Sequence, residues 1–149
     1  MKLMLLLALG SAWINGHVTA ADLRDKVVVL DVFTVDCYNC QNVVPALRAL
    51  YSEDRARGLR VIGIHAPETP AERSRPYVEQ SLARQGIVWP VVIDNNFALW
   101  HAYGVQAWPT QLIFDRNGEL RKVIVGDSQD REVRAEVESL LKGIDRPNG

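Results

Sequence analysis

Three apolar runs dominate the pattern of hydrophobic positions along the chain. They cover residues 26–35, 59–66 and 87–94 and are rich in β-branched side chains. Continuous rather than alternating apolar runs of this length are typical of strands that are buried on both faces of a parallel sheet. Two further strands are predicted on either side of Asp115–Gly118, because the Asn117-Gly118 pair is typical of a tight hairpin.

Apolar residues at helical spacing fill the intervals between these strands. A helix is predicted after the first run, ending at Gly58, and a second begins near Ser74 and ends at Gly86. A short helix is predicted to close at Gly104, and a last amphipathic helix covers about residues 129–142. Each helix therefore follows a strand, in the order β-α-β and then α-β-β-α.

This order of elements predicts the fold class. Strands joined by helices run parallel, whereas a hairpin is antiparallel, so we expect an α/β domain with a mixed central sheet and helices on both faces. A chain of 149 residues fits one domain. We expect that domain to cover residues 13–143, followed by a flexible tail at residues 144–149.

Composition and charge narrow the range of functions. Hydrophobic residues make up 48% of the chain, charged residues 23%, and the formal net charge is −1. These values are typical of an ordinary globular protein, and the cationic residues are not gathered into a patch that would bind nucleic acid. We therefore expect no nucleic-acid partner, and we expect a monomer.

The first twelve residues have the order of a secretory signal. Lys2 is followed by an apolar run from Leu3 to Leu9 and by the small residues at positions 10–12. We predict that residues 1–12 are a signal peptide or an N-terminal apolar segment. The run is far shorter than the roughly 20 residues that span a bilayer, so we expect no stable membrane span.

Both cysteines of the chain lie in the stretch Cys37-Tyr38-Asn39-Cys40, where the first predicted strand meets the first helix. Such a pair can be a structural disulfide, half of a metal site, or a dithiol that is made and broken during turnover. A zinc site needs about four ligands, and the three histidines are scattered, which disfavours a metal. Residues three apart at a helix start lie about 5–6 Å apart, within the range that a disulfide tolerates.

The position of each cysteine on the helix predicts its role. Cys37, at the N-terminal edge, meets unpaired backbone N–H groups and the positive end of the helix dipole, which favour a thiolate. Cys40 lies one turn inside and is expected to be more buried. We therefore predict that Cys37 is the nucleophile and that Cys40 is the resolving thiol.

Four features of the sequence are shared with one known family. They are the Cys-Tyr-Asn-Cys motif, Asp31 six residues before Cys37, Pro45 five residues after Cys40, and Trp108-Pro109-Thr110 before the predicted hairpin. With these, the sequence resembles the extracytoplasmic thiol-disulfide oxidoreductases of the TlpA type in the thioredoxin superfamily. The resemblance covers about residues 13–141, and residues 64–94 resemble the strand-helix insertion that separates TlpA-like proteins from plain thioredoxin.

The resemblance implies a thioredoxin-like fold and a set of site residues. Trp108–Pro109 would be a cis peptide facing the cysteines. Together with Tyr38 and Asn39 it would contact an extended substrate segment. The sequence departs from thioredoxin in one place beside the motif, where Asp36 replaces the usual tryptophan before Cys37.

Acidic residues are expected to influence the cysteines. Asp31 would lie beneath the disulfide and take the proton of Cys40 through a water molecule, or else serve folding alone. Glu68 would tune the thiol pKa or relay a proton, or else be a plain surface charge. Carboxylates at Asp36 and Asp31 would oppose a thiolate, so we expect a reducing potential, nearer thioredoxin (about −270 mV) than DsbA (about −120 mV).

The expected activity is exchange of the Cys37-Cys40 dithiol with protein thiols and disulfides, as a reductase. No bound cofactor is implied, since the electrons would come from an upstream dithiol protein. The resemblance and the apolar N-terminus imply the periplasm or the cell envelope, and a cytoplasmic location stays open.

Two other functions fit parts of the sequence. One is a peroxiredoxin-like thiol peroxidase, because Thr34 and Cys37 have the Thr-x-x-Cys order that activates peroxide, although the usual preceding proline is absent. The other is a non-enzymatic thioredoxin-fold binding module in which the disulfide is structural. Reduction of insulin and consumption of peroxide distinguish these functions.

Overall fold

A computed structural model describes residues 6–10 and 12–143 of the chain. The tail expected at residues 144–149, and residues 1–5 and 11 of the expected leader, lie outside the described residues. The strands are β1 (Ala12–Ile14), β2 (Val27–Phe33), β3 (Leu59–His65), β4 (Val91–Ile93), β5 (Thr110–Phe114) and β6 (Leu120–Val125). The α-helices are α2 (Ala20–Leu23), α3 (Tyr38–Asp54), α4 (Arg75–Gln85), α5 (Ala98–Ala102) and α6 (Asp130–Leu141), and short 3-10 turns cover Arg55–Arg57 (η1) and Ala71–Arg73 (η2).

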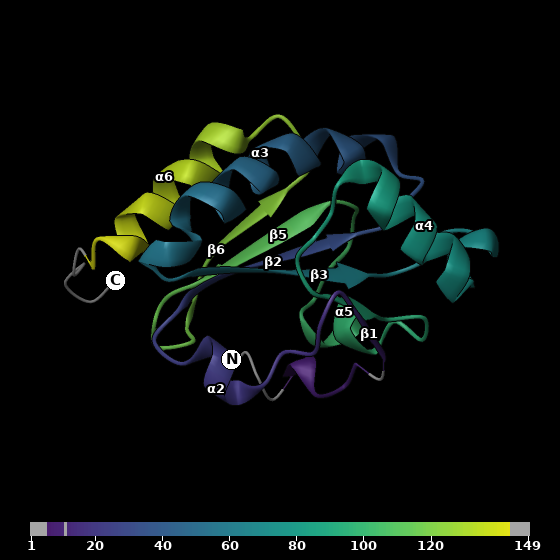
Figure 1. Cartoon of the computed structure of the whole chain (residues 1–149), viewed down its shortest axis with the longest axis horizontal. Helices are drawn as coiled ribbons and strands as arrows, with labels where there is room; N and C mark the ends of the chain where they lie inside the picture. Colours follow the sequence, from purple (N-terminus) through teal and green to yellow (C-terminus); the bar gives the residue numbers. More distant parts are fainter. Residues whose placement is uncertain (1–5, 11, 144–149) are drawn as a thin grey trace.

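The six strands form one mixed sheet in the order β1-β4-β3-β2-β5-β6. Strands β2, β3 and β4 run parallel to one another, whereas β1, β5 and β6 join by antiparallel pairing. Helices α3, α4 and α6 cover one face, which we call the α3 face, and α2 and α5 lie on the other, the α5 face (Figure 1). The predicted fold class, a mixed sheet with helices on both faces, is confirmed.

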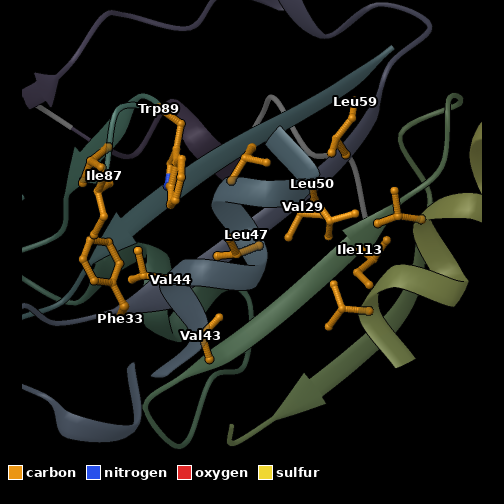
Figure 2. Close-up of a cluster of buried hydrophobic side chains, with 14 of the residues drawn as sticks. Val29, Phe33, Val43, Val44, Leu47, Leu50, Leu59, Ile87, Trp89 and Ile113 are labelled. Atoms are coloured by element: carbon orange, nitrogen blue, oxygen red, sulfur yellow. The ribbon is translucent and has the colours of Figure 1, made fainter. Parts of the chain in front are cut away.

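Each face of the sheet carries its own apolar core. Every residue of β2 is buried, which explains why this strand is a continuous apolar run rather than an alternating one. Its side chains alternate, so Val29 and Phe33 point to the α3 face, where they belong to one cluster with Val44, Leu47 and Leu50 of α3 (Figure 2). This face also receives the active-site end of α3, because Cys40 belongs to the same cluster.

The third predicted strand is shorter than the apolar run suggests. The run covers residues 87–94, but β4 begins only at Val91. Ile87 instead donates its backbone N–H to the carbonyl of Leu82 at the end of α4, and Pro90 lacks an N–H for the ladder. Ile87 and Trp89 are nevertheless buried, so the run marks core residues beyond the strand itself.

Two short elements were not predicted from the pattern. Strand β1 has three residues and pairs with β4 at the edge of the sheet. Helix α2 has four residues and begins with a capping box, in which the Thr19 hydroxyl accepts the N–H of Asp22 and the Asp22 carboxylate accepts the N–H of Thr19. Both elements are too short to show a hydrophobic period.

The described part of the expected leader packs against the domain. Leu7 is 1% exposed and belongs to the core on the α5 face. Gly10 lies so close to this core that an added Cβ would fall 2.1 Å from Cγ2 of Val92. No helix in the described residues is long and apolar enough to cross a bilayer.

Candidate active site

A disulfide between Cys37 and Cys40 lies at the start of α3. Cys37 is the N-cap of this helix, and its sulfur accepts the backbone N–H of Cys40 at 3.2 Å. The two Cα atoms are 5.1 Å apart, within the range expected for this spacing. Cys37 is partly exposed whereas Cys40 is 2% exposed, so a foreign sulfur can approach only the first cysteine.

The two residues between the cysteines face solvent. Tyr38 is 75% exposed, an unusual fraction for a large aromatic side chain, and Asn39 is also exposed. Asp36, on the other side of Cys37, is exposed too, and both of its carboxylate oxygens accept the hydroxyl of Tyr77 from α4, at 2.8 and 2.9 Å. Polar groups therefore border Cys37 on both sides.

Asp31 lies in the middle of β2 with its side chain on the α3 face, between Val29 and Phe33 and on the side of the sheet where Cys40 lies. It is 2% exposed, and its Oδ1 atom has no hydrogen-bond partner among the described residues. Burial without such a donor raises the pKa of Asp31 to about 7. The carboxyl group can therefore gain or lose a proton near neutral pH.

The acidic residue that enters the site from the insertion is Glu72, not the expected Glu68. Glu68 is exposed, and only its backbone N–H takes part, donating to Oε1 of Glu72 at 3.0 Å. Glu72 is 1% exposed and accepts hydrogen bonds from five donors. These are the N–H groups of Asp36, Glu68 and Thr69 and the hydroxyls of Thr34 and Thr69.

Burial raises the pKa of Glu72, but these hydrogen bonds outweigh it, so the pKa lies below its ordinary value. Glu72 is therefore a buried carboxylate that keeps its charge. The sequence contains a signal for it, since Thr69-Pro70-Ala71-Glu72 has the order of a capping box with proline in the first helical position. Nothing in the local sequence indicates the contact with Asp36, 36 residues away.

His65 ends β3 beneath the same loop and is fully buried. Its Nε2 atom accepts the backbone N–H of Val35 at 3.2 Å and lies 3.2 Å from the Thr34 hydroxyl. Burial lowers the pKa of His65 to about 4, so the ring is neutral at physiological pH. The proton of this neutral ring is then on Nδ1, which has no hydrogen-bond partner among the described residues.

Trp108 and Pro109 lie at the start of β5, and the peptide bond between them is cis. The indole N–H of Trp108 donates to the carbonyl of Ala66, just after β3, at 2.8 Å. The ring of Trp108 packs 4.4 Å from that of Trp100 and 6.2 Å from that of Phe97, measured between centroids. These contacts fix the loop at the edge of the sheet where β2 ends and Cys37 follows.

Two hollows lie away from this edge. They have volumes of about 410 and 640 Å³ and share the residues Lys26, Arg55 and Arg60. Lys26 precedes β2 whereas Cys37 follows it, so these hollows are at the opposite end of the sheet from the disulfide. Neither contributes a group to the chemistry of the cysteines.

In the described residues, no three His, Cys, Asp or Glu side chains gather as a metal site would require.

Comparison with known proteins finds several relatives. The chain is 33% identical over 127 residues to the protein DipZ of Mycobacterium bovis, a match that covers 85% of this chain and 18% of DipZ. It is 29% identical over 119 residues to the thiol-disulfide oxidoreductase ResA of Geobacillus thermodenitrificans, which covers 80% of this chain and 66% of ResA. The chain thus spans about a fifth of the length of DipZ.

Solved structures agree with these matches. A thiol-disulfide isomerase from Corynebacterium glutamicum superposes with a TM-score of 0.79 at 26% identity, covering 89% of this chain and 92% of that one. The family model of the AhpC/TSA family matches residues 8–123, which include all the site residues described above. The chain therefore belongs to the AhpC/TSA family, and its thioredoxin-like fold is shared with thiol-disulfide oxidoreductases.

Proposed function

We propose that this chain is a thiol-disulfide oxidoreductase that reduces disulfides of other proteins through Cys37 and Cys40. The observation that carries the proposal is the unequal exposure of a closed Cys-x-x-Cys pair, with a partly exposed sulfur at the N-cap of α3 and a buried one a turn further on. A purely structural disulfide needs no such difference in access. The names of ResA and of the isomerase support the same activity.

The first step is attack by the Cys37 thiolate on one sulfur of a substrate disulfide. The substrate S–S bond breaks, a mixed disulfide forms, and the departing substrate thiolate takes up a proton. The N–H of Cys40, already directed at the Cys37 sulfur, stabilises the negative charge on Cys37 before the attack.

The second step is release of the substrate. The thiolate of Cys40 attacks the Cys37 sulfur, the mixed disulfide breaks, and the second substrate thiolate departs and is protonated. The substrate has then gained two electrons and the chain has lost them. Asp31 is suited to take the proton of Cys40, since it lies on the same face of the sheet and titrates near pH 7.

Substrate contacts are proposed at the residues that border Cys37. Tyr38 and Asn39 present exposed side chains directly after it. Trp108 and Pro109 offer backbone at the edge of the sheet beside it, where an extended segment could pair. An upstream dithiol protein would return the electrons, and the resemblance to the extracytoplasmic TlpA-type oxidoreductases supports a place in the cell envelope.

Two cysteine variants test the proposed exchange. Cys40→Ser should accumulate a mixed disulfide between Cys37 and a disulfide-bonded model substrate such as insulin, because the resolving thiol is absent. Cys37→Ser should trap none, because Cys40 is buried. The wild-type protein should accelerate the reduction of insulin by dithiothreitol, and neither variant should accelerate it. Equal trapping by the two variants, or no acceleration by the wild type, would refute the proposal.

The thiol-peroxidase alternative has less support. A peroxidase of the Thr-x-x-Cys type would need the Thr34 hydroxyl beside the reacting sulfur. Thr34 is 1% exposed, and its hydroxyl donates to the buried carboxylate of Glu72. We therefore expect no consumption of hydrogen peroxide above that of free cysteine when a reductant is supplied.

A further inference from the structure

Side chains of the insertion, residues 64–94, hold the loop in front of Cys37 by hydrogen bonds. This loop, Thr34–Asp36, joins the end of β2 to the N-cap of α3, so its conformation decides where the Cys37 sulfur lies. Glu72 accepts the Thr34 hydroxyl and the Asp36 N–H, the latter at 2.9 Å. Residues 34 and 36 are thus held by the same carboxylate.

Two more insertion side chains hold the same loop. Gln85, the last residue of α4, donates its side-chain amide to the carbonyl of Val35 at 2.9 Å. Tyr77, in the first turn of α4, donates its hydroxyl to the carboxylate of Asp36. Each loop residue therefore has a partner in the insertion, and the partners come from both η2 and α4.

The buried position of Glu72 makes it different from the other two. Tyr77 is half-buried and Gln85 partly buried, whereas Glu72 is 1% exposed and carries a full charge. A buried carboxylate is screened far less than a surface one. Its oxygen bonds the N–H of the residue directly before Cys37, so its field acts on the Cys37 sulfur.

The start of α3 acts on the sulfur in the opposite sense to Glu72. The N–H groups at a helix start stabilise a thiolate there. Among the described residues, the hydrogen bond to the Cys37 sulfur comes from Cys40. Cys37 thus has the helix N-terminus on one side and a fixed negative charge on the other.

We propose that Glu72 is a positioning residue that holds the Thr34–Asp36 loop in place and keeps Cys37 largely in its thiol form. This proposal rests on the proposed function in that both concern Cys37, but it is tested by the ionisation of Cys37 and not by disulfide exchange. The insertion would then contribute a residue to the redox site in addition to its place in the fold.

The other charged groups near the loop do not replace Glu72. His65 and Asp31 are buried, and the carboxylate of Asp36 is bound to Tyr77. On the far side, Asn42 in the first turn of α3 donates to Asp127. The positive charge of Arg84 acts on the Tyr77 hydroxyl, and the Arg84 guanidinium donates a hydrogen bond to the Ser81 hydroxyl. Glu72→Gln substitutes none of these groups, and the charge that it removes also acts on His65 and Tyr77.

Glu72→Gln tests the proposal because it removes the charge with little change in side-chain volume, and its amide oxygen can still accept the hydrogen bonds of one of the two Glu72 oxygens. The rate at which iodoacetamide alkylates Cys37 is measured against pH in a Cys40→Ser background, which leaves one thiol. The midpoint should move down by at least about half a pH unit, and alkylation at pH 6 should be about threefold faster. Glu79→Gln is the matched control, because Glu79 lies on α4 and pairs with Arg75 at the surface. It should leave the midpoint unchanged.

A second measurement needs no substitution. Charge coupling is reciprocal, so the side-chain carboxyl carbon of Glu72 should show a step in its NMR chemical shift at the pH where Cys37 ionises in the reduced wild-type protein. The oxidised protein should show no such step.

The absence of that step in the reduced protein would overturn the proposal. So would a Glu72→Gln variant that keeps the wild-type circular dichroism and the midpoint of the Glu79→Gln control. Neither measurement depends on insulin reduction. If the chain fails to reduce insulin but Glu72→Gln shifts the alkylation midpoint, the proposed function is refuted and the role of Glu72 is supported. If the chain reduces insulin but the midpoint does not shift, the proposed function is supported and the role of Glu72 is refuted.

Discussion

Replacing Asp31 by asparagine should change how stability depends on pH. Asp31 is 2% exposed in the centre of the sheet, its Oδ1 has no hydrogen-bond partner among the described residues, and burial raises its pKa to about 7 from 3.8. The folded protein therefore prefers the neutral carboxyl, whereas the unfolded chain ionises freely above pH 4. Asn has nearly the same shape as the neutral carboxyl and cannot ionise.

The size of the effect follows from the difference between the two pKa values. Below pH 3.8 the carboxyl is neutral in both states, and its contribution to stability is fully present. As the pH rises towards 7, the unfolded state loses the proton and the folded state retains it, so the free energy of unfolding falls. A difference of about three pKa units at 1.36 kcal/mol each corresponds to a loss of up to about 4 kcal/mol.

The pH curve of the wild type alone would not show this loss. Burial lowers the pKa of His65 to about 4, so between pH 4 and 6.5 the unfolded chain binds a proton that the folded protein does not. The slope from His65 is positive over this window and the slope from Asp31 is negative, with nearly equal size. The difference between the wild type and Asp31→Asn cancels the His65 contribution and isolates that of Asp31.

Urea unfolding of the oxidised proteins at pH 4, 5.5, 7 and 8.5 provides this difference. Relative to the wild type, Asp31→Asn should gain up to about 4 kcal/mol in free energy of unfolding between pH 4 and pH 8.5. Asp130→Asn, at an exposed carboxylate in the first turn of α6, is the control and should show a nearly constant difference. A difference for Asp31→Asn that is equally constant over this range would refute the reasoning.

Two other predictions concern stability. In the Asp31→Asn background, the free energy of unfolding should fall by up to about 3 kcal/mol from pH 6.5 to pH 4, because neutral His65 must be protonated on unfolding; urea unfolding that shows no fall contradicts a buried neutral imidazole. Leu7→Ala should lower the free energy of unfolding by about 2–4 kcal/mol, because Leu7 is 1% exposed in the core on the α5 face; an unchanged urea midpoint would show that residues before β1 do not pack there.

The main strands and helices were predictable because their sequences agree at every level. The run over β2 is apolar on both faces because both faces are covered. The turn η1, which follows α3 directly, ends where Gly58 adopts a left-handed conformation, with φ of 109°. The placement of Cys37 at the helix start and Cys40 one turn inside follows from the same pattern. These features depend on neighbours within a few residues, which a single sequence displays directly.

The contacts around Glu72 were not predictable, because they join residues that are distant in the sequence. Its partners Thr34 and Asp36 are more than 30 residues away, and the insertion reaches the loop only because β2 and β3 lie side by side in the sheet. The sequence could show only that Thr69-Pro70-Ala71-Glu72 has the order of a capping box. It could not show whether the side chain of Glu68 or that of Glu72 is the one buried against the loop, because both residues are acidic.

The two buried acids of this site illustrate how local donors decide the protonation of a carboxyl group. Asp31 and Glu72 are almost equally buried, at 2% and 1% exposure. Glu72 accepts five hydrogen bonds and keeps its charge, whereas Asp31 lacks a donor to Oδ1 and is shifted towards the neutral form. Groups with pKa values separated in this way suit different tasks: a fixed charge can hold a loop and bias a thiol, while a group that titrates near pH 7 can accept a proton and return it. We therefore propose that Asp31 carries protons during the proposed disulfide exchange, whereas Glu72 shapes the site without exchanging protons.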